Sequence, residues 1–439
     1  MINKDWVKIA AVFCFLFFCH AAISCSPKNS DTTLFISGLD TSRLQKYAFF
    51  QLDSNRIVDP DSIMTVFYDK LTELQKRNAS VSDTLLPDVV SVLHIGDSHI
   101  QAGVFPATVR RLFQLNFGNA GRGFIAPLKL AKTNEPNDYK ITSPQEWNNS
   151  KCVQRTVEYP VGLGGIAIAT DSKEVVFTIQ TLQKDTTDSI EYSFNSVTAF
   201  HHDKAPWLRE GEEFGIDSYC PDTARAYLTR IPLMQHTDSV SLYAAVGEDG
   251  YDVPVFYGFS LENGKNGILY HSVGVNSACY THYAGQPEMI RETADLEPAL
   301  IILSMGTNEA STSRFNGEMF YNEMKMLVDG LRRVNPGVPL LLTVPAENYR
   351  RVSRSYVQNG NIGKVRNTIA RFAAENGVAY WDLFQVGGGK GAAGKWYANR
   401  LFSRDRIHFT AEGYELQGML LYDALMNSYR DYLRGDAEH

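Results

Sequence analysis

The stretch Val89–His99 has the sequence VVSVLHIGDSH. Its first part is rich in Val, Leu and Ile, which is typical of a strand buried on both faces of a parallel sheet. The run then ends in a glycine turn that is followed at once by Ser98. In open α/β folds, the residues that follow the carboxyl ends of the strands build the functional site. The stretch therefore predicts a central parallel strand that delivers a hydroxyl group to that edge.

Four further apolar runs have the length and composition of buried strands, and helical patterns lie between several of them. One helix is predicted from Phe315 to Val334, and Thr410 can cap a final helix. The alternation predicts an α/β domain in three αβα layers, with a parallel five-stranded sheet between helices. The four runs are Gly267–Val273, Ala299–Met305, Pro339–Val344 and Val378–Phe384.

The interval between the first two strands is too long for one crossover connection, and its residue pattern differs from that of the flanking segments. Residues 138–263 contain short β-rich runs separated by Asp, Lys, Thr and Gly, which predicts an inserted all-β sandwich. The α/β domain is then expected in two parts, residues 86–137 and 264–439.

The amino-terminal segment predicts export. Residues 1–24 combine two lysines with an apolar run that is too short to span a bilayer, as in a signal peptide. The end of the run resembles the lipobox of bacterial lipoproteins, which implies a lipid anchor on Cys25 in the periplasm or outer membrane; ordinary signal cleavage is the alternative. Residues 25–85 are expected to form a linker and an accessory helix.

Charge and residue content limit the nucleic-acid partners, disulfide bridges and metal sites that can be expected. The formal net charge of −7 offers no field to attract a polyanion, so nucleic acid is not expected as a partner. Cys152 and Cys220 are the more plausible pair for one bridge, although the sequence leaves the connectivity open. No metal is predicted, since the run His201–Asp203 is more typical of a polar loop than of a ligand cluster.

Three more segments bring small or polar residues to the functional edge. The second strand ends near Gly274, the third is followed by Asn308, and Asp405 and His408 precede the final helix. With the GDS run that ends at Ser98, these segments resemble, in order, the four sequence blocks of the SGNH (GDSL-type) hydrolases.

The resemblance implies a serine esterase. Ser98 would be the nucleophile, His408 its base and Asp405 the residue that orients the base. The backbone N–H groups of Ser98 and Gly274 and the side-chain amide of Asn308 would form the oxyanion hole. No cofactor is implied. Among the other candidates, turn formation is expected of Asp97 and Gly306, and packing or supporting roles are expected of His94, His99, His271 and Asp382.

Within this superfamily, the string from His94 to His99, the β-rich insert and the pair Asn308-Glu309 resemble the peptidoglycan O-acetylesterases, which carry an inserted sandwich of carbohydrate-binding type. The chain departs from their pattern at Ser277, where a glycine is expected after Asn276. The resemblance implies an O-acetylated glycan as substrate, either peptidoglycan or another envelope or dietary glycan. The alternatives are a lipid or thioester hydrolase on the same scaffold and a non-catalytic glycan-binding lipoprotein.

Overall fold

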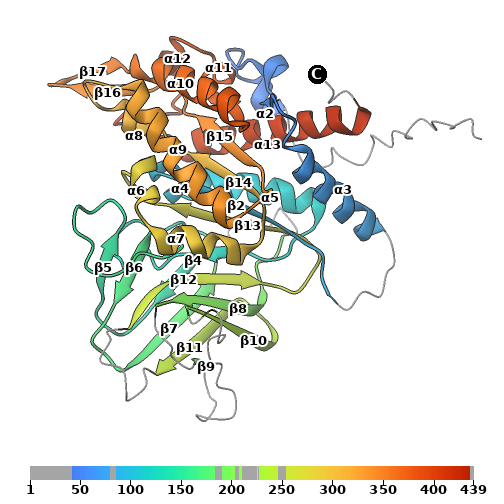
Figure 1. Cartoon of the computed structure of the whole chain (residues 1–439), viewed down its shortest axis with the longest axis vertical. Helices are drawn as coiled ribbons and strands as arrows, with labels where there is room; N and C mark the ends of the chain where they lie inside the picture. The colour runs from blue at the N-terminus through green and yellow to red at the C-terminus, as the bar shows by residue number, and fades with distance from the viewer. Residues whose placement is uncertain are drawn as a thin grey trace, which may run out of the picture.

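The computed structural model describes residues 42–79, 86–182, 190–202, 207–209, 225, 227–245 and 254–435. Figure 1 shows two parts: an α/β body, and a group of β-strands, drawn mainly in green, at the bottom of the view. The chain enters the body, leaves it for the β-rich part and returns.

The body contains a six-stranded sheet in the order β1-β18-β15-β14-β2-β13. Five neighbouring strands are parallel, as predicted, and the two-residue strand β1 (Ile57–Val58) pairs antiparallel with β18 at one edge. The parallel strands are β2 (Val89–Gly96), β13 (Gly267–Gly274), β14 (Pro298–Ser304), β15 (Leu340–Val344) and β18 (Ala379–Asp382).

Side-chain alternation in the strands separates two packed layers, because successive residues of a strand face opposite sides. Val90 and Val92 face a hydrophobic cluster with α3 (Thr65–Ala79), α5 (Val104–Phe117) and α13 (Ala411–Arg434). Leu93 and Ile95 face the other cluster, which contains α9 (Gly317–Val334) and α10 (Asn361–Asn376). The three-layer αβα architecture is therefore confirmed.

Short helices follow several strands and bring residues to the carboxyl edge of the sheet. They are α4 (Ser98–Gln101) after β2, α6 (Tyr280–Ala284) and α7 (Pro287–Glu292) after β13, α8 (Thr307–Ala310) after β14, and α11 (Leu383–Val386) and α12 (Ala392–Ala398) after β18. The last helix begins as predicted, since the Thr410 side chain accepts a hydrogen bond from the backbone N–H of Gly413.

The β-rich part consists of two sheets. One has the order β10-β8-β12-β6-β5 with β3 also paired to β12, and the other has the order β4-β7-β11-β9. Phe177 of the second sheet packs against Phe256 and Phe259 of the first, so the sheets share aromatic contacts. The strands are β3 (Gly123–Ile125), β4 (Tyr139–Thr142), β5 (Asn148–Lys151), β6 (Ile166–Ala169), β7 (Glu174–Thr181), β8 (Phe194–His201), β9 (Trp207–Arg209), β10 (Leu228–Thr237), β11 (Ser239–Ala245) and β12 (Val255–Glu262).

The expected insert boundary at residue 138 stays a prediction, but strands on its two sides pair with each other. β3 lies before residue 138, yet it pairs antiparallel with β12, which lies within the expected insert. The hydrophobic cluster that contains Leu93 also extends through both sheets of the β-rich part. The two parts therefore share one continuous core.

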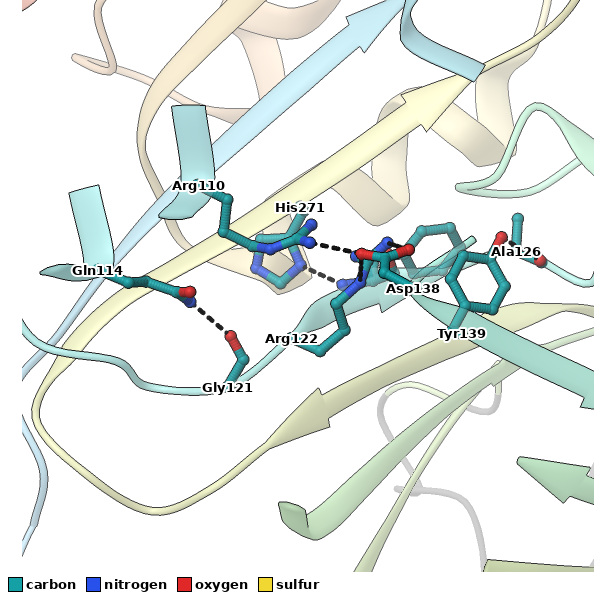
Figure 2. A network of polar contacts seen from close by, with 9 residues as sticks. Arg110, Gln114, Gly121, Arg122, Ala126, Asp138, Tyr139 and His271 are labelled. Carbon is teal, nitrogen blue, oxygen red and sulfur yellow. Dashed lines mark hydrogen bonds and ion pairs between the residues drawn. The ribbon is translucent and has the colours of Figure 1, made fainter. Parts of the chain in front are cut away.

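A buried ion cluster joins the two parts (Figure 2). Arg110 of α5 lies 2.5 Å from Asp138, and the Nε of Arg122 lies 2.8 Å from the same carboxylate. The arginine side chains are 1% and 2% exposed. Burial alone would raise the pKa of Asp138, but the two guanidinium groups outweigh it and hold the pKa at about 2. The cluster is thus a fully charged contact between α5, the segment before β3 and the start of β4.

The segment before β2 is more integrated than the expected linker. Asn55, which is fully buried, donates a hydrogen bond to the carbonyl of Leu420 and accepts one from the indole N–H of Trp381. The expected accessory helix is present as α3, and it packs on α5 and α13. Residues 42–79 therefore pack against the body, and the expected domain division stays a prediction.

Some expectations fall on other parts of the chain. The signal segment and Cys25 lie outside the described residues, as does Cys220. Cys152 is buried and has no bridge within the described residues, so its expected pairing with Cys220 stays a prediction. Within the described ranges, no helix has both the length and the apolar character that a membrane crossing requires.

Candidate active site

Ser98 lies where the sequence predicts it, at the first position of α4 directly after β2. The Asp97 side chain caps this short helix by accepting a hydrogen bond from the backbone N–H of His99. A side chain at Gly96 would collide with Ile100 and with the Ser304 carbonyl, so glycine is required by the close packing of α4 and β14 at this point. As the first helical residue, Ser98 also presents a backbone N–H that has no intrahelical acceptor.

His408 and Asp405 lie together on the loop that precedes α13. The Nε2 atom of His408 lies 2.9 Å from the Ser98 Oγ, and its Nδ1 atom lies 2.7 Å from the Asp405 Oδ2. The other Asp405 oxygen accepts hydrogen bonds from the backbone N–H groups of Ile407 and His408, both at 2.9 Å. The structure thus brings the three predicted residues into one hydrogen-bonded chain.

The protonation states in this chain suit proton transfer from Ser98. Burial alone would raise the pKa of Asp405, but the hydrogen bonds from the His408 ring and the backbone lower it below its ordinary value. An ionised carboxylate can only accept hydrogen bonds, so the proton of neutral His408 belongs on Nδ1. Nε2 is then left as an acceptor for the Ser98 hydroxyl proton.

The hydrogen-bonded chain opens into a cleft of about 690 Å³. Ser98 and His408 line the cleft, and most of the other lining residues are polar. Asparagine is the most frequent, with Asn134, Asn276, Asn308, Asn348 and Asn359. Such a lining can donate to and accept from the hydroxyl groups of a polar ligand.

The structure places Asn308 at the cleft as predicted, in the first turn of α8 after β14. Its amide nitrogen donates to the carbonyl of Ala278 at 2.9 Å and lies 3.4 Å from the Asp97 carboxyl. The contact with Asp97 is the longer and weaker one. The Asn308 amide hydrogen that points toward Asp97 is therefore the one that could donate to an oxyanion instead.

Gly274 is not among the residues that line the cleft. A Cβ atom there would lie 2.2 Å from the backbone nitrogen of Gln101, so glycine is required by the close packing of β13 against α4, not by room for a substrate. Asn276 and Ser277 line the cleft instead. Ser277 has a left-handed backbone, with φ of 67°. The sequence signal for this difference was that Ser277 follows Asn276 where the family pattern has glycine.

The remaining histidines near the site have supporting contacts. His94 is buried and lies within hydrogen-bond distance of the Tyr270 and Ser304 hydroxyls, at 2.7 and 2.6 Å. The His99 ring lies beside that of His408, and its Nδ1 lies 3.0 Å from the Tyr414 hydroxyl. Burial first, and then the nearby His408, lowers the pKa of His99 to about 3, so this ring stays neutral beside the catalytic candidate.

Two other predicted supporting residues have structural contacts. His271 is buried, and its Nδ1 accepts a hydrogen bond from the backbone N–H of Phe124. Asp382 caps α11 and forms a 2.6 Å ion pair with Arg366. Within the described ranges, no three His, Cys, Asp or Glu side chains are grouped so that they could hold a metal ion.

Comparisons with known proteins agree with this architecture. Residues 241–416 match the model of the GDSL-like lipase/acylhydrolase family. The match includes the segments of Asn308, Asp405 and His408 but begins after Ser98, which the fold brings to the same edge. A search of curated protein sequences finds no match.

Among solved structures, a peptidoglycan O-acetylesterase superposes with a TM-score of 0.68 at 19% identity, covering 85% of this chain and 99% of that one. At this identity the likeness shows a shared fold. A lipase/acylhydrolase from Enterococcus faecalis gives a TM-score of 0.29 at 17% identity, covering 37% of this chain and 77% of its own. A GDSL-like lipase from Bacteroides thetaiotaomicron also gives 0.29, at 20% identity with 36% and 76% covered. The family match over residues 241–416 and the shared fold together support the resemblance to the SGNH (GDSL-type) hydrolases.

Proposed function

We propose that this chain is a serine esterase that removes O-acetyl groups from a glycan, with O-acetylated peptidoglycan as the first candidate substrate and other envelope or dietary glycans as alternatives. The observation that carries the proposal is the chain of contacts from Ser98 through His408 to Asp405, which opens into a polar cleft. The shared fold with a peptidoglycan O-acetylesterase supports the choice of substrate.

The proposed reaction has two halves. The Ser98 Oγ attacks the acetyl carbonyl while His408 Nε2 takes its proton, and Asp405 stabilises the imidazolium that forms. His408 then returns the proton to the sugar oxygen as the C–O bond breaks, which leaves acetyl-Ser98 and the free sugar hydroxyl. In the second half, His408 activates a water molecule that attacks the acetyl group, and acetate is released with Ser98 restored.

The tetrahedral intermediates carry a negative oxygen that needs hydrogen-bond donors. The Ser98 backbone N–H and the Asn308 amide are the proposed donors on one side of the cleft. On the other side, we assign this role to the backbone at Ser277 in place of Gly274, because Ser277 lines the cleft and Gly274 packs against α4.

The lining of the cleft favours a short acyl group. Its asparagines suit sugar hydroxyls, and Ala102, Ile407 and Phe409 are the lining residues with wholly apolar side chains. Affinity must then come mainly from the sugar side, since burial of one methyl group contributes only about 1 kcal/mol. A lipid hydrolase is therefore the less supported alternative.

The test is acetate release from O-acetylated peptidoglycan, measured beside acetylated plant xylan. We expect faster release from peptidoglycan, and kcat/KM should fall from acetyl to butyryl to octanoyl p-nitrophenyl esters. A profile that rises toward octanoyl would overturn the acetylesterase assignment in favour of a lipid hydrolase. No turnover of any ester would favour the non-catalytic glycan-binding alternative.

We also propose that the protein is exported and that acyl chains on Cys25 anchor it to a membrane surface. Such chains provide membrane affinity through burial of their methylene groups. Mass spectrometry of the mature amino-terminal peptide tests this. A lipidated Cys25 supports the anchor, and an unmodified terminus elsewhere would show ordinary secretion.

A further inference from the structure

Two arginines share the cleft with the proposed nucleophile. After β15, the chain forms a hairpin of β16 (Tyr349–Val352) and β17 (Ser355–Gln358). Arg350 and Arg351 of this hairpin line the same cleft as Ser98. The proposed reaction does not use this hairpin.

The charge of the cleft differs from that of the whole chain. Arg350 and Arg351 are its lining residues with a permanent charge, and no Asp, Glu or Lys lines it. Neither arginine forms an ion pair with another described residue. The chain as a whole has a formal net charge of −7. A cationic wall in an otherwise anionic protein attracts anions locally.

The hairpin is fixed to the loop that carries the base. The backbone N–H of Tyr349 donates to the carbonyl of Arg406, two residues before His408, at 3.1 Å. The Arg406 guanidinium in turn lies over three tyrosine rings, 4.1 Å from the centroid of Tyr397, 5.0 Å from that of Tyr356 and 5.4 Å from that of Tyr349. The hairpin backbone is thereby positioned relative to His408.

The base of the hairpin is also closed. The backbone N–H of Asn359 donates to the Asn348 carbonyl at 2.9 Å, and the two side-chain amides contact each other at 3.2 Å. Both asparagines are buried. The two arginines are therefore carried by an anchored element, where a binding group loses less freedom when its ligand binds.

We propose that Arg350 and Arg351 form a carboxylate-binding subsite, so that the preferred substrate is an acetylated glycan that carries carboxylate groups near the ester. The inference rests on the proposed esterase function and adds the charge class of the substrate. The planar guanidinium group matches a carboxylate with paired hydrogen bonds. Consecutive strand residues face opposite sides of a hairpin, so the two arginines should contribute unequally.

The experiment compares one glycan with and without its charge. O-acetylated muramoyl peptides are assayed for acetate release before and after their carboxylates are converted to neutral methylamides. The enzymes are the wild type, Arg350→Gln, Arg351→Gln, the double variant, and Arg354→Gln as a matched control. Arg354 lies at the turn of the same hairpin and does not line the cleft.

We expect amidation to lower kcat/KM of the wild type by about tenfold or more, mainly through KM, as for loss of a charge-assisted hydrogen bond. The double variant should show the same loss on the charged glycan and little further loss on the amidated one. Arg354→Gln should behave like the wild type on both glycan forms and on p-nitrophenyl acetate.

Two failures are distinguishable. If the wild type releases acetate equally from the charged and amidated glycans, or the double variant keeps wild-type kcat/KM on the charged one, the subsite is overturned and the esterase proposal stands. If the wild type cleaves p-nitrophenyl acetate but neither glycan form, the glycan substrate is overturned and the subsite with it.

Discussion

The molecule contains two networks of polar and charged groups that differ in solvent exposure. The first joins Ser98, His408 and Asp405, and the second is the cluster of Arg110, Asp138 and Arg122. His408 and Asp405 have side chains that are 39% and 46% exposed. The two arginines of the cluster are 1% and 2% exposed, and Asp138 is 19% exposed. The first network lies at the sheet edge, whereas the second, drawn in Figure 2, lies where the body meets the β-rich part.

Because of this difference in exposure, we expect the first network to determine turnover and the second to determine the stability of the fold. Water can solvate a member of the exposed network when its partner is removed, so the fold should tolerate changes there. In the buried cluster, loss of Asp138 leaves two arginines without their counter-charge, which is strongly destabilising. Variants of the first network should therefore alter turnover, and variants of the second should alter folding.

The largest effect is expected for Ser98→Ala. Loss of the nucleophile should lower kcat for p-nitrophenyl acetate by on the order of 10⁴- to 10⁶-fold, because nucleophile and base act as a unit. The thermal unfolding midpoint should stay close to that of the wild type. Activity near the wild-type level would remove Ser98 from the mechanism, and a large drop in the midpoint would contradict the separation of chemistry from stability.

The second effect should have the opposite pattern. Asp138→Asn removes the negative charge between Arg110 and Arg122 and should lower the free energy of unfolding by about 3–5 kcal/mol. Turnover per folded molecule should be kept. The matched control is Asp329→Asn, because Asp329 pairs with Lys325 on an exposed helix face and should cost less than about 1 kcal/mol. Equal losses in urea unfolding of the two variants would refute the role of the cluster.

A smaller loss is expected for Asn308→Ala. Removal of one oxyanion donor should lower kcat by about 10²- to 10³-fold, with KM little changed. Steady-state kinetics on p-nitrophenyl acetate measure both constants. If KM rises while kcat is kept, Asn308 binds the substrate and does not stabilise the transition state.

The pattern of correct and incorrect predictions follows from which contacts are local in sequence. The five parallel strands could be predicted because each is a short, mainly apolar run, and Asp405 and His408 were identified through their resemblance to the last sequence block of the SGNH hydrolases. Ser98 could be placed because it directly follows the first strand. These features depend on short segments whose pattern is complete in itself.

Features that depend on distant contacts were missed. The requirement for glycine at position 274 comes from the backbone of Gln101, which is remote in sequence. The cluster at Asp138 combines three separate segments, and no local pattern marks Arg110 or Arg122 as its partners. The association of residues 42–79 with the body likewise depends on contacts such as that between Asn55 and Trp381.

The last effect concerns pH and tests the contact between the parts at another point. Glu292 of α7 is buried and accepts a hydrogen bond from the backbone N–H of Leu163 at 2.7 Å. Burial raises its pKa from 4.5 to about 8, although that hydrogen bond opposes the shift. Because the folded pKa exceeds the unfolded one, its stabilising contribution is full below about pH 4.5 and is lost as pH rises toward 8.

Glu292→Gln keeps an accepting oxygen but does not titrate. Relative to this variant, the wild type should lose stability as pH rises from 5 to 8, by at most about 1.4 kcal/mol per pH unit. Urea unfolding of both proteins at several pH values measures the difference, which cancels the titration of groups common to both. A difference that is independent of pH would show that Glu292 is already ionised in the folded state.

The most direct test of the central claim is to trap the acyl-enzyme. The wild type is mixed with p-nitrophenyl acetate and quenched in acid within the first turnover, and its peptides are mapped by mass spectrometry. We predict one acetyl group on the peptide that contains Ser98, located on the Ser98 oxygen and absent from Ser98→Ala. Acetylation at another residue, with turnover kept in Ser98→Ala, would contradict it.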